Sequence, residues 1–217
     1  MLNVPHSLRR RFTDLVASIY LYNEHRGYTG LEEFLAAARR RFPGDRVFLA
    51  GVQKHLDDER RHYRMFRAYF EAGMRMPYAI SSEWGYVDRL LAAVGLAGNG
   101  KDAAALEAAD GSTFAAVCRM ILLTEERGLR QVERVLAWPW VREDHRLAAI
   151  FTVIRRDEPS HSAPYRAWLA GRRGPWPDRP TPRERLADLV THHRLVHLSL
   201  PLAYANPRLV RRVAFPA

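Results

Sequence analysis

The pattern Asp-Glu-x-x-His occurs twice in this chain, as Asp58-Glu59-Arg60-Arg61-His62 and as Asp157-Glu158-Pro159-Ser160-His161. Residues three apart lie on the same face of an α-helix, so each copy presents a glutamate and a histidine next to each other. In both copies these side chains fall on an apolar face, with Phe66 near the first and Phe151 near the second. Because a buried carboxylate without a partner costs several kcal/mol, the pattern indicates a site that compensates the buried charge.

The spacing of apolar residues predicts an all-α protein with four long helices, at about residues 7–41, 46–74, 112–136 and 143–169. The turns Pro43-Gly44-Asp45 and Trp138-Pro139-Trp140 stop the first and third helices, which gives two antiparallel hairpins. The stretch 76–111, with its glycines and Pro77, is expected to be a long crossover carrying one or two short helices. Residues 1–170 form the predicted helical domain, and 171–217 a linker with a basic, apolar helical segment.

The other two long helices each carry one glutamate at the centre of the apolar stripe, Glu24 in the first and Glu125 in the third. Glu126 adjoins Glu125 but lies toward the charged side of that helix, so it is the less favoured candidate. Glu24 precedes Glu59 by 35 residues, and Glu125 precedes Glu158 by 33. Since each pair spans one hairpin turn, all four carboxylates are expected at one level along the helices.

This set of side chains predicts a site for two metal ions. Four carboxylates and two imidazoles can hold two divalent ions if two glutamates bridge them and each ion gains one terminal carboxylate and one histidine. The predicted roles are Glu59 and Glu158 as bridging ligands, Glu24 and Glu125 as terminal ligands, and His62 and His161 as nitrogen ligands. The positive charge of the ions then compensates four buried acids.

Through the two Asp-Glu-x-x-His stretches, Glu24 and Glu125, the chain from about Ser7 to Leu169 resembles the ferritin-like di-iron carboxylate superfamily. That superfamily includes rubrerythrins, aldehyde-deformylating oxygenases, acyl-carrier-protein desaturases, ribonucleotide reductase small subunits and tRNA hydroxylases. The resemblance implies a ferritin-like four-helix bundle that binds two iron ions, although manganese or a mixed manganese and iron pair suits the same ligands. It also implies that Asp58 orients His161 and that Asp157 orients His62.

Other polar residues share these helix faces. His55 lies one turn before Glu59 and could support a ligand, contact a substrate or be an ordinary core histidine. Tyr20 and Tyr165 lie on the same stripes as ligands, where a hydroxyl could bond to one of them. Pro159 removes a backbone hydrogen bond inside the fourth helix, which predicts a kink or π-bulge beside the metals. The alternative is a broken helix with a decayed motif.

The predicted function is that of a non-haem di-iron oxidoreductase, an oxygenase that uses dioxygen to oxidise or hydroxylate an organic substrate, including a lipid-like one. An external electron donor is expected, because the single cysteine, Cys118, leaves no rubredoxin-like Cys-x-x-Cys knuckle. A second hypothesis is a ferroxidase-type or structural iron-binding protein. A third is a tRNA-modifying hydroxylase, for which the net charge of +10 is the only support. Nucleic acid is not favoured, since no compact block of lysine and arginine is present.

The sequence also predicts where the protein works. With no cleavable leader and no span of membrane length, a cytoplasmic protein is expected, and a homodimer is compatible with it. Residues 183–217 combine leucines with arginines, so they form either a fifth helix packed on the bundle or a peripheral contact with an anionic membrane. The residues that carry this pattern are Leu195, Leu198, Leu200, Leu202, Tyr204, Arg194, Arg208, Arg211 and Arg212.

Overall fold

The computed structural model describes residues 5–80, 89, 103–171, 174, 176–206, 208 and 210–215. Within these residues the chain is helical, without a strand beyond an isolated bridge between Tyr78 and Arg212. The helices are α1 (His6–Arg41), α2 (Arg46–Ala72), α4 (Ala103–Ala108), α5 (Gly111–Ala137), α6 (Pro139–Glu143), α7 (His145–His161), α8 (Ala163–Gly171), α9 (Pro182–His193), η1 (Arg194–Ser199) and α10 (Leu200–Ala205). The all-α class predicted from the sequence is confirmed for this part of the chain.

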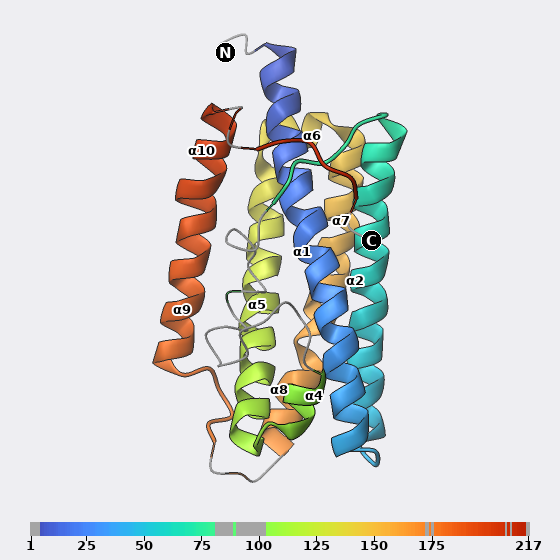
Figure 1. The fold of residues 1–217 in the computed structure, drawn as a ribbon, viewed down its shortest axis with the longest axis vertical. Coiled ribbons are helices and arrows are strands. Elements are labelled where there is room, and N and C mark those ends of the chain that lie inside the picture. The colour runs from blue at the N-terminus through green and yellow to red at the C-terminus, as the bar shows by residue number, and fades with distance from the viewer. Residues whose placement is uncertain are drawn as a thin grey trace.

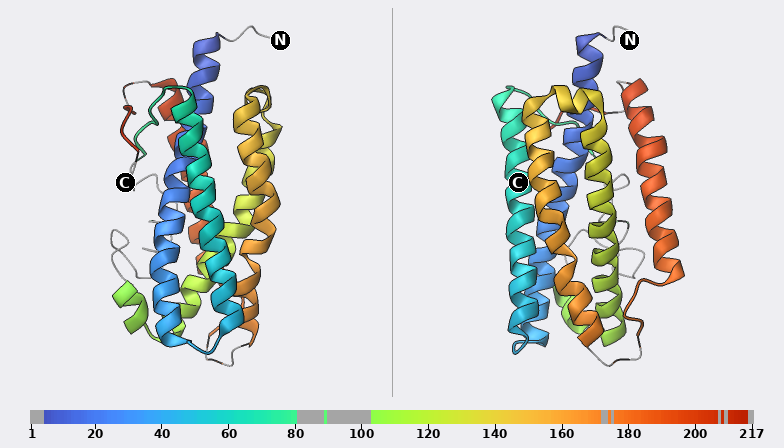
Figure 2. Two further views of the ribbon diagram at one scale, coloured as in Figure 1. Left: turned by 90° about the vertical axis from the view of Figure 1, so that its right-hand side faces the viewer. Right: turned by 180° about the vertical axis from the view of Figure 1, so that it is seen from behind.

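The long helices form two antiparallel hairpins that lie side by side (Figure 1). α1 packs against α2, and α5 packs against α7 and α8. α2 also contacts α7 and α8, which joins the two hairpins, and the helices keep to the long axis in both further views (Figure 2). The predicted crossover contributes α4, and its residues 81–88 and 90–102 lie outside the described residues.

Aspartate side chains cap the starts of α2, α5 and α7, although only Asp45 lies in a turn predicted from the sequence. The Asp45 side chain accepts a hydrogen bond from the Phe48 amide at the start of α2. Asp110 does the same for Thr113 in α5, and Asp144 caps α7. Such caps satisfy backbone N–H groups that have no partner within the helix, so each turn stops one helix and sets the start of the next.

The expectation of one continuous fourth helix over 143–169 was wrong, because this segment is divided into α6, α7 and α8. Pro159 stays inside α7, and the interruption falls at Ser162, just before Pro164 in the first turn of α8. A proline is tolerated in a first turn, where its missing N–H would have no helical partner anyway. The break therefore comes after His161, and the whole second Asp-Glu-x-x-His stretch remains on one helix.

The two largest apolar clusters among the described residues lie one toward each end of the helices. One contains Phe34, Phe48, Phe114 and Tyr165, and the other is built around Phe66, with Leu21, Phe151 and Ile154. Along α1, α2, α5 and the α7–α8 segment, the predicted ligand positions fall between the residues of the two clusters. The apolar core thus closes the site from both ends.

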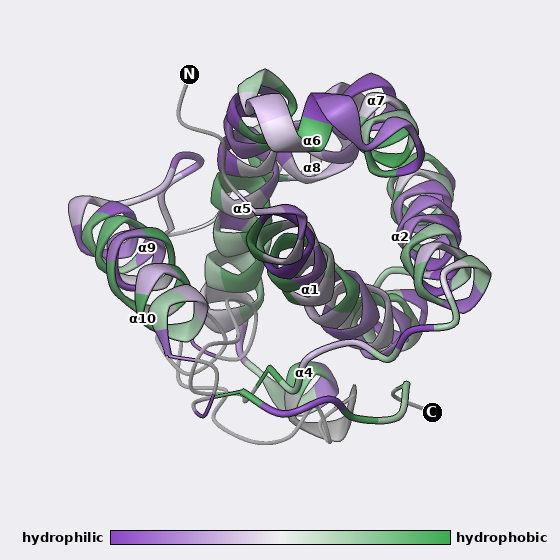
Figure 3. Cartoon of the chain, turned by 90° about the horizontal axis from the view of Figure 1, so that it is seen from above, coloured by the Kyte–Doolittle hydropathy of each residue, from purple (hydrophilic) through white to green (hydrophobic). Residues whose placement is uncertain are grey.

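The C-terminal helices pack against the outside of the hairpins, beside α5 and α1 (Figure 3). Buried Arg119 pairs with Glu184 at 2.8 Å, and buried Arg127 pairs with Asp188 at 3.1 Å. The single last helix expected from the sequence is interrupted by the π-helix η1. This irregular turn precedes Pro201, which lacks the N–H that a regular helix would direct to the carbonyl of His197.

The packed position agrees with a fifth helix on the bundle, while membrane contact stays a prediction. Leu198 and Leu202 are about half exposed, but Leu200 is partly buried against the core, and the Leu195 side chain lies outside the described residues. Arg212 is paired with Asp14. Among the described residues, none of the helices combines the length and apolar character needed to cross a membrane.

Asp14 links three separate parts of the chain. Its side chain is fully buried in α1, and its two oxygens bind Arg75, just after α2, and Arg212, near the C-terminus. Removing the carboxylate would leave two guanidinium groups without this partner. The two ion pairs therefore hold the segment after α2 and the segment around Arg212 against α1.

We expect Asp14→Ala to lower the free energy of unfolding by about 2 to 3 kcal/mol in urea denaturation. This is somewhat less than for a fully buried pair, because Arg212 reaches solvent. Asp57→Ala, which removes an exposed carboxylate of α2, is the control and should change stability by no more than about 0.5 kcal/mol. Equal effects in the two variants would contradict the role of Asp14.

Candidate metal centre

The six predicted ligand residues meet at the middle of the helices. Glu24, His62, Glu158 and His161 are buried, and the side chains of Glu59 and Glu125 are 12% and 11% exposed. Each comes from the helix expected: Glu24 from α1, Glu59 and His62 from α2, Glu125 from α5, and Glu158 and His161 from α7. Glu126 instead pairs with Arg166 at 2.8 Å near the surface, so Glu125 is the inward member of that pair.

Glu59 lies at the centre of the arrangement. Its Oε1 is 3.8 Å from Nδ1 of His62 and 3.8 Å from Nδ1 of His161. Nδ1 of His62 is also 3.3 Å from Glu24 Oε2, and Nδ1 of His161 is 3.3 Å from Glu125 Oε2. Two groups of side-chain atoms that could hold a metal ion therefore share Glu59, as a carboxylate that bridges two ions would.

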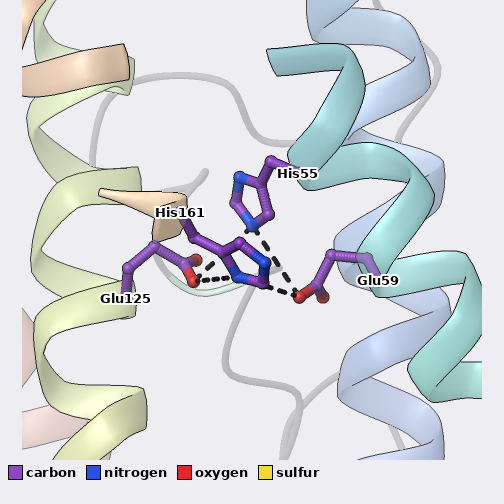
Figure 4. A group of neighbouring side chains, drawn as sticks. All are labelled: His55, Glu59, Glu125 and His161. Atoms are coloured by element: carbon purple, nitrogen blue, oxygen red, sulfur yellow. Dashed lines mark ion pairs between the residues drawn. The ribbon is translucent and has the colours of Figure 1, made fainter. Parts of the chain in front are cut away.

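These groups are Glu24, Glu59 and His62 in one, and His55, Glu59, Glu125 and His161 in the other. Within each group the ligand atoms lie within 4.8 Å of one another. Figure 4 shows the second group, with His55 and Glu59 on α2 facing Glu125 of α5 across His161. Glu158, outside both groups, places Oε2 at 3.8 Å from Nδ1 of His161.

The residues fit a pair of metal ions. Among the described residues, Glu24 Oε2, Glu158 Oε2 and the Nδ1 atoms of His62 and His161 are buried without a hydrogen-bond partner. Donor atoms that share an ion at about 2.1 Å lie about 3 to 4 Å from each other, as these atoms do. Buried polar atoms are rarely left unpaired, so the orphaned atoms are those that a metal would take.

The outer ring nitrogens of the two histidines are held by aspartates across the helix pair. His161 Nε2 lies 3.1 Å from Asp58 Oδ2, and His62 Nε2 lies 3.2 Å from Asp157 Oδ2. These are the pairings that the resemblance implied. In these hydrogen bonds Nε2 of each histidine carries a proton, so Nδ1 is the ring atom that would coordinate a metal ion.

The sequence analysis did not single out Arg61, which ties the two aspartates together. One of its nitrogens donates to Asp58 and to Asp157, at 2.7 Å each. Lys54 donates to Asp58 at 2.6 Å, and despite burial, His161 and Lys54 lower the pKa of Asp58. In the sequence, Arg61 looks like an ordinary solvated arginine, because its neighbours Arg60 and His62 are also basic. Its role becomes visible only when the second hairpin lies beside it.

Neither predicted tyrosine contacts one of the six ligands through a described hydrogen bond. The Tyr165 hydroxyl lies 3.0 Å from His55 Nδ1. Tyr20 packs edge-on against Phe151, with ring centres 4.7 Å apart. Burial raises the pKa values of both phenols, so both are neutral in the physiological range.

The four glutamates cannot all be ionised without a counter-charge. Burial raises the pKa of Glu24, and the charge of Glu59 raises it further. Burial is also the main reason why the pKa of Glu158 is raised, and the charge of Glu125 raises it further. Although burial opposes it, neighbouring imidazoles lower the pKa values of Glu59 and Glu125. The metal-free cluster therefore retains carboxyl protons that metal ions would displace.

Two glycines, also unremarked in the sequence, lie beside Glu59 and Glu158, and the first of them leaves room for Glu59. Gly27 stands three residues after Glu24, and a Cβ there would lie 2.5 Å from Glu59 Oε2. Gly128 stands three residues after Glu125, and a Cβ there would make an ordinary van der Waals contact, 3.4 Å from Glu158 Oε2. The two hairpins thus share an extended pattern, Glu-x-x-Gly on one helix and Glu-x-x-His on the next.

A cavity of about 590 Å³ reaches the carboxylates from between α1 and α5. Glu24, Glu59, Glu125, Glu158 and His55 form part of its wall. Much of the remaining wall is apolar and includes Val16, Ile19, Leu31, Phe34, Val117 and Ile121. His192, Val196, His197 and Leu200 contribute a wall from the C-terminal helices. An apolar molecule in this cavity would lie next to the proposed metal ligands.

A scan against protein-family models, a search of curated proteins and a search of solved structures found no match to this chain.

We expect Gly27→Ala to weaken divalent metal binding by about tenfold or more, because the new methyl group displaces Glu59. Competition with a chromophoric chelator measures this affinity. Gly30→Ala is the matched control, since it lies one turn further along α1 with nothing within 4 Å of its Cβ. It should leave the affinity unchanged. Equal affinities in the two variants would contradict a metal-binding position of Glu59 that needs the space left by Gly27.

Metal affinity should fall as the pH is lowered from about 8 to 6, by about tenfold per pH unit for each proton displaced. The raised pKa values of Glu24 and Glu158 mean that these carboxyl groups are protonated over more of this range in the metal-free protein. Chelator competition at several pH values, corrected for the chelator's own protonation, measures the slope. A flat or inverted dependence would contradict the protonated cluster.

Proposed function

We propose that this chain is a di-metal carboxylate oxidase or oxygenase with a ferritin-like four-helix bundle, and that it binds two iron ions and uses dioxygen to oxidise or hydroxylate an organic substrate. One observation carries the proposal: the glutamates that could hold two ions also line a largely apolar cavity. A purely structural metal site would have no need of a cavity against its ligands.

The donor set favours iron or manganese among the common metals. Oxygen-rich sites with a few imidazoles suit these ions, whereas thiolate-rich sites suit zinc and copper. Bound reduced iron would supply the electrons for the reduction of dioxygen and the oxidising power for the substrate. Cys118 is buried and is the single cysteine of the chain, so renewed reduction would need an external electron donor.

The protein residues have separate tasks in this proposal. Glu59 and Glu158 would bridge the ions, with Glu24 and Glu125 as terminal ligands and His62 and His161 as nitrogen ligands. Asp58 and Asp157 keep the imidazoles in one orientation and hold the proton on Nε2, and Arg61 fixes both aspartates. This network would preserve the ligand geometry during turnover.

The cavity favours an apolar organic substrate. Apolar side chains on α1 and α5 offer few hydrogen-bond partners, so a hydrocarbon portion fits this wall better than a strongly polar one. A lipid-like substrate is therefore the preferred class.

The proposal is tested by loading the protein with ferrous iron without oxygen and then admitting air. We expect about two irons per chain by elemental analysis, a new near-ultraviolet absorption on exposure to air, and loss of both in Glu59→Ala. Glu133→Ala, which removes an exposed glutamate of α5, is the control and should behave as the unaltered protein. Failure to bind iron, or bound iron that does not react with oxygen, would overturn the proposed function.

A further inference from the structure

His55 faces the cluster from α2, one helical turn before Glu59. Its side chain is 2% exposed, and its ring stacks on that of His161 with centres 4.2 Å apart and planes 24° from parallel. Residues four apart share a helix face, which explains why His55 and Glu59 reach the same place. His55 is therefore part of the cluster although it belongs to neither Asp-Glu-x-x-His stretch.

The two nitrogens of His55 have different surroundings. Nδ1 lies 3.0 Å from the hydroxyl of fully buried Tyr165, and this hydrogen bond fixes the ring. Nε2 points to the opposite side, 3.5 Å from Glu125 Oε2 and 3.7 Å from Glu59 Oε1. Among the described residues it has no hydrogen-bond partner and is fully shielded from solvent. A histidine serving only as core would be expected to pair both nitrogens.

The orphaned Nε2 stands where a metal ligand would stand. It joins Glu59, Glu125 and His161 in one group whose ligand atoms all lie within 4.8 Å of one another. The distances from Nε2 to the carboxylates are too long for hydrogen bonds but suit donor atoms around a shared ion. With Nδ1 protonated and directed to Tyr165, the lone pair of Nε2 would be available to that ion.

The second hairpin has no equivalent of this residue. The position four residues before Glu158 is Ile154, a fully buried apolar side chain. The group of Glu24, Glu59 and His62 correspondingly contains a single histidine. The two halves match in their Glu-x-x-Gly and Glu-x-x-His patterns but differ in this one nitrogen donor.

We propose that His55 is a third histidine ligand, which binds through Nε2 the ion held by Glu125 and His161. The two metal positions then have unequal donor sets, with two imidazoles at this position and one at the position of Glu24 and His62. Because imidazole raises affinity for later first-row metals such as cobalt, this position fills first. The inference rests on the proposed di-metal centre.

The test uses the full-length metal-free protein and Co²⁺ under anaerobic conditions, with X-ray absorption to count imidazoles and optical titration to measure both affinities. At one equivalent, we expect two imidazoles per cobalt in the unaltered protein and one in His55→Ala. The tighter binding step should weaken by about tenfold or more in the variant. These readouts report coordination and do not depend on catalysis.

Ile154→Ala is the matched control, because it shortens a buried side chain at the corresponding position of the other hairpin. It should lower Tm but leave the cobalt imidazole count unchanged. His55→Gln, closer in size, serves if His55→Ala does not fold, and the imidazole count of the unaltered protein is decisive without any variant.

A count of one imidazole per cobalt in the unaltered protein, or an unchanged first affinity in a folded His55 variant, would overturn the third ligand and leave the di-metal centre intact. Failure of the unaltered protein to bind cobalt would overturn both.

Discussion

Four glutamate side chains each lie within 4 Å of an imidazole in the apolar interior, and the rest of the structure is arranged around that charge. Burial and mutual repulsion raise the pKa values of Glu24 and Glu158, so the cluster can be ionised only with compensating positive charge. In the metal-free protein, protonated imidazoles supply part of this compensation. A pair of divalent ions, which bind neutral imidazoles, would supply it in their place. Apolar clusters above and below the site keep water away, which makes this compensation necessary.

The two hairpins meet this constraint in nearly the same way. Each provides a glutamate with a glycine three residues later, and a second glutamate with a histidine three residues later. Each aspartate binds the histidine of the other hairpin, so the orientation of each histidine depends on the other half of the protein. Arg61 donates hydrogen bonds to both aspartates. His55 breaks the equivalence, since Ile154 takes its place in the second half. In the proposed centre this difference would make the two metal positions chemically distinct.

Four of the arginines contribute to the tertiary structure through ion pairs with acidic side chains. Arg119 and Arg127 are buried and pair with acids of α9, which places the C-terminal helices beside α5. Arg75 and Arg212 share Asp14 at the end of the α1–α2 hairpin. Through the first two pairs, the chain positions His192, Val196 and Leu200 as a wall of the cavity. Part of the positive charge is thus neutralised by ion pairs within the protein.

The sequence by itself determined the helices, their turns and the inward residues, because helical periodicity and burial are local properties that show in the spacing of polar and apolar side chains. It placed Glu24, Glu59, His62, Glu125, Glu158 and His161 on the correct helix faces, and the resemblance supplied the aspartate pairings. Only the tertiary structure decided the break after His161, the roles of Arg61 and Gly27, and the direction of the His55 ring. These features depend on distances between helices that are far apart in the sequence, and the residue pattern of a single helix does not contain such distances.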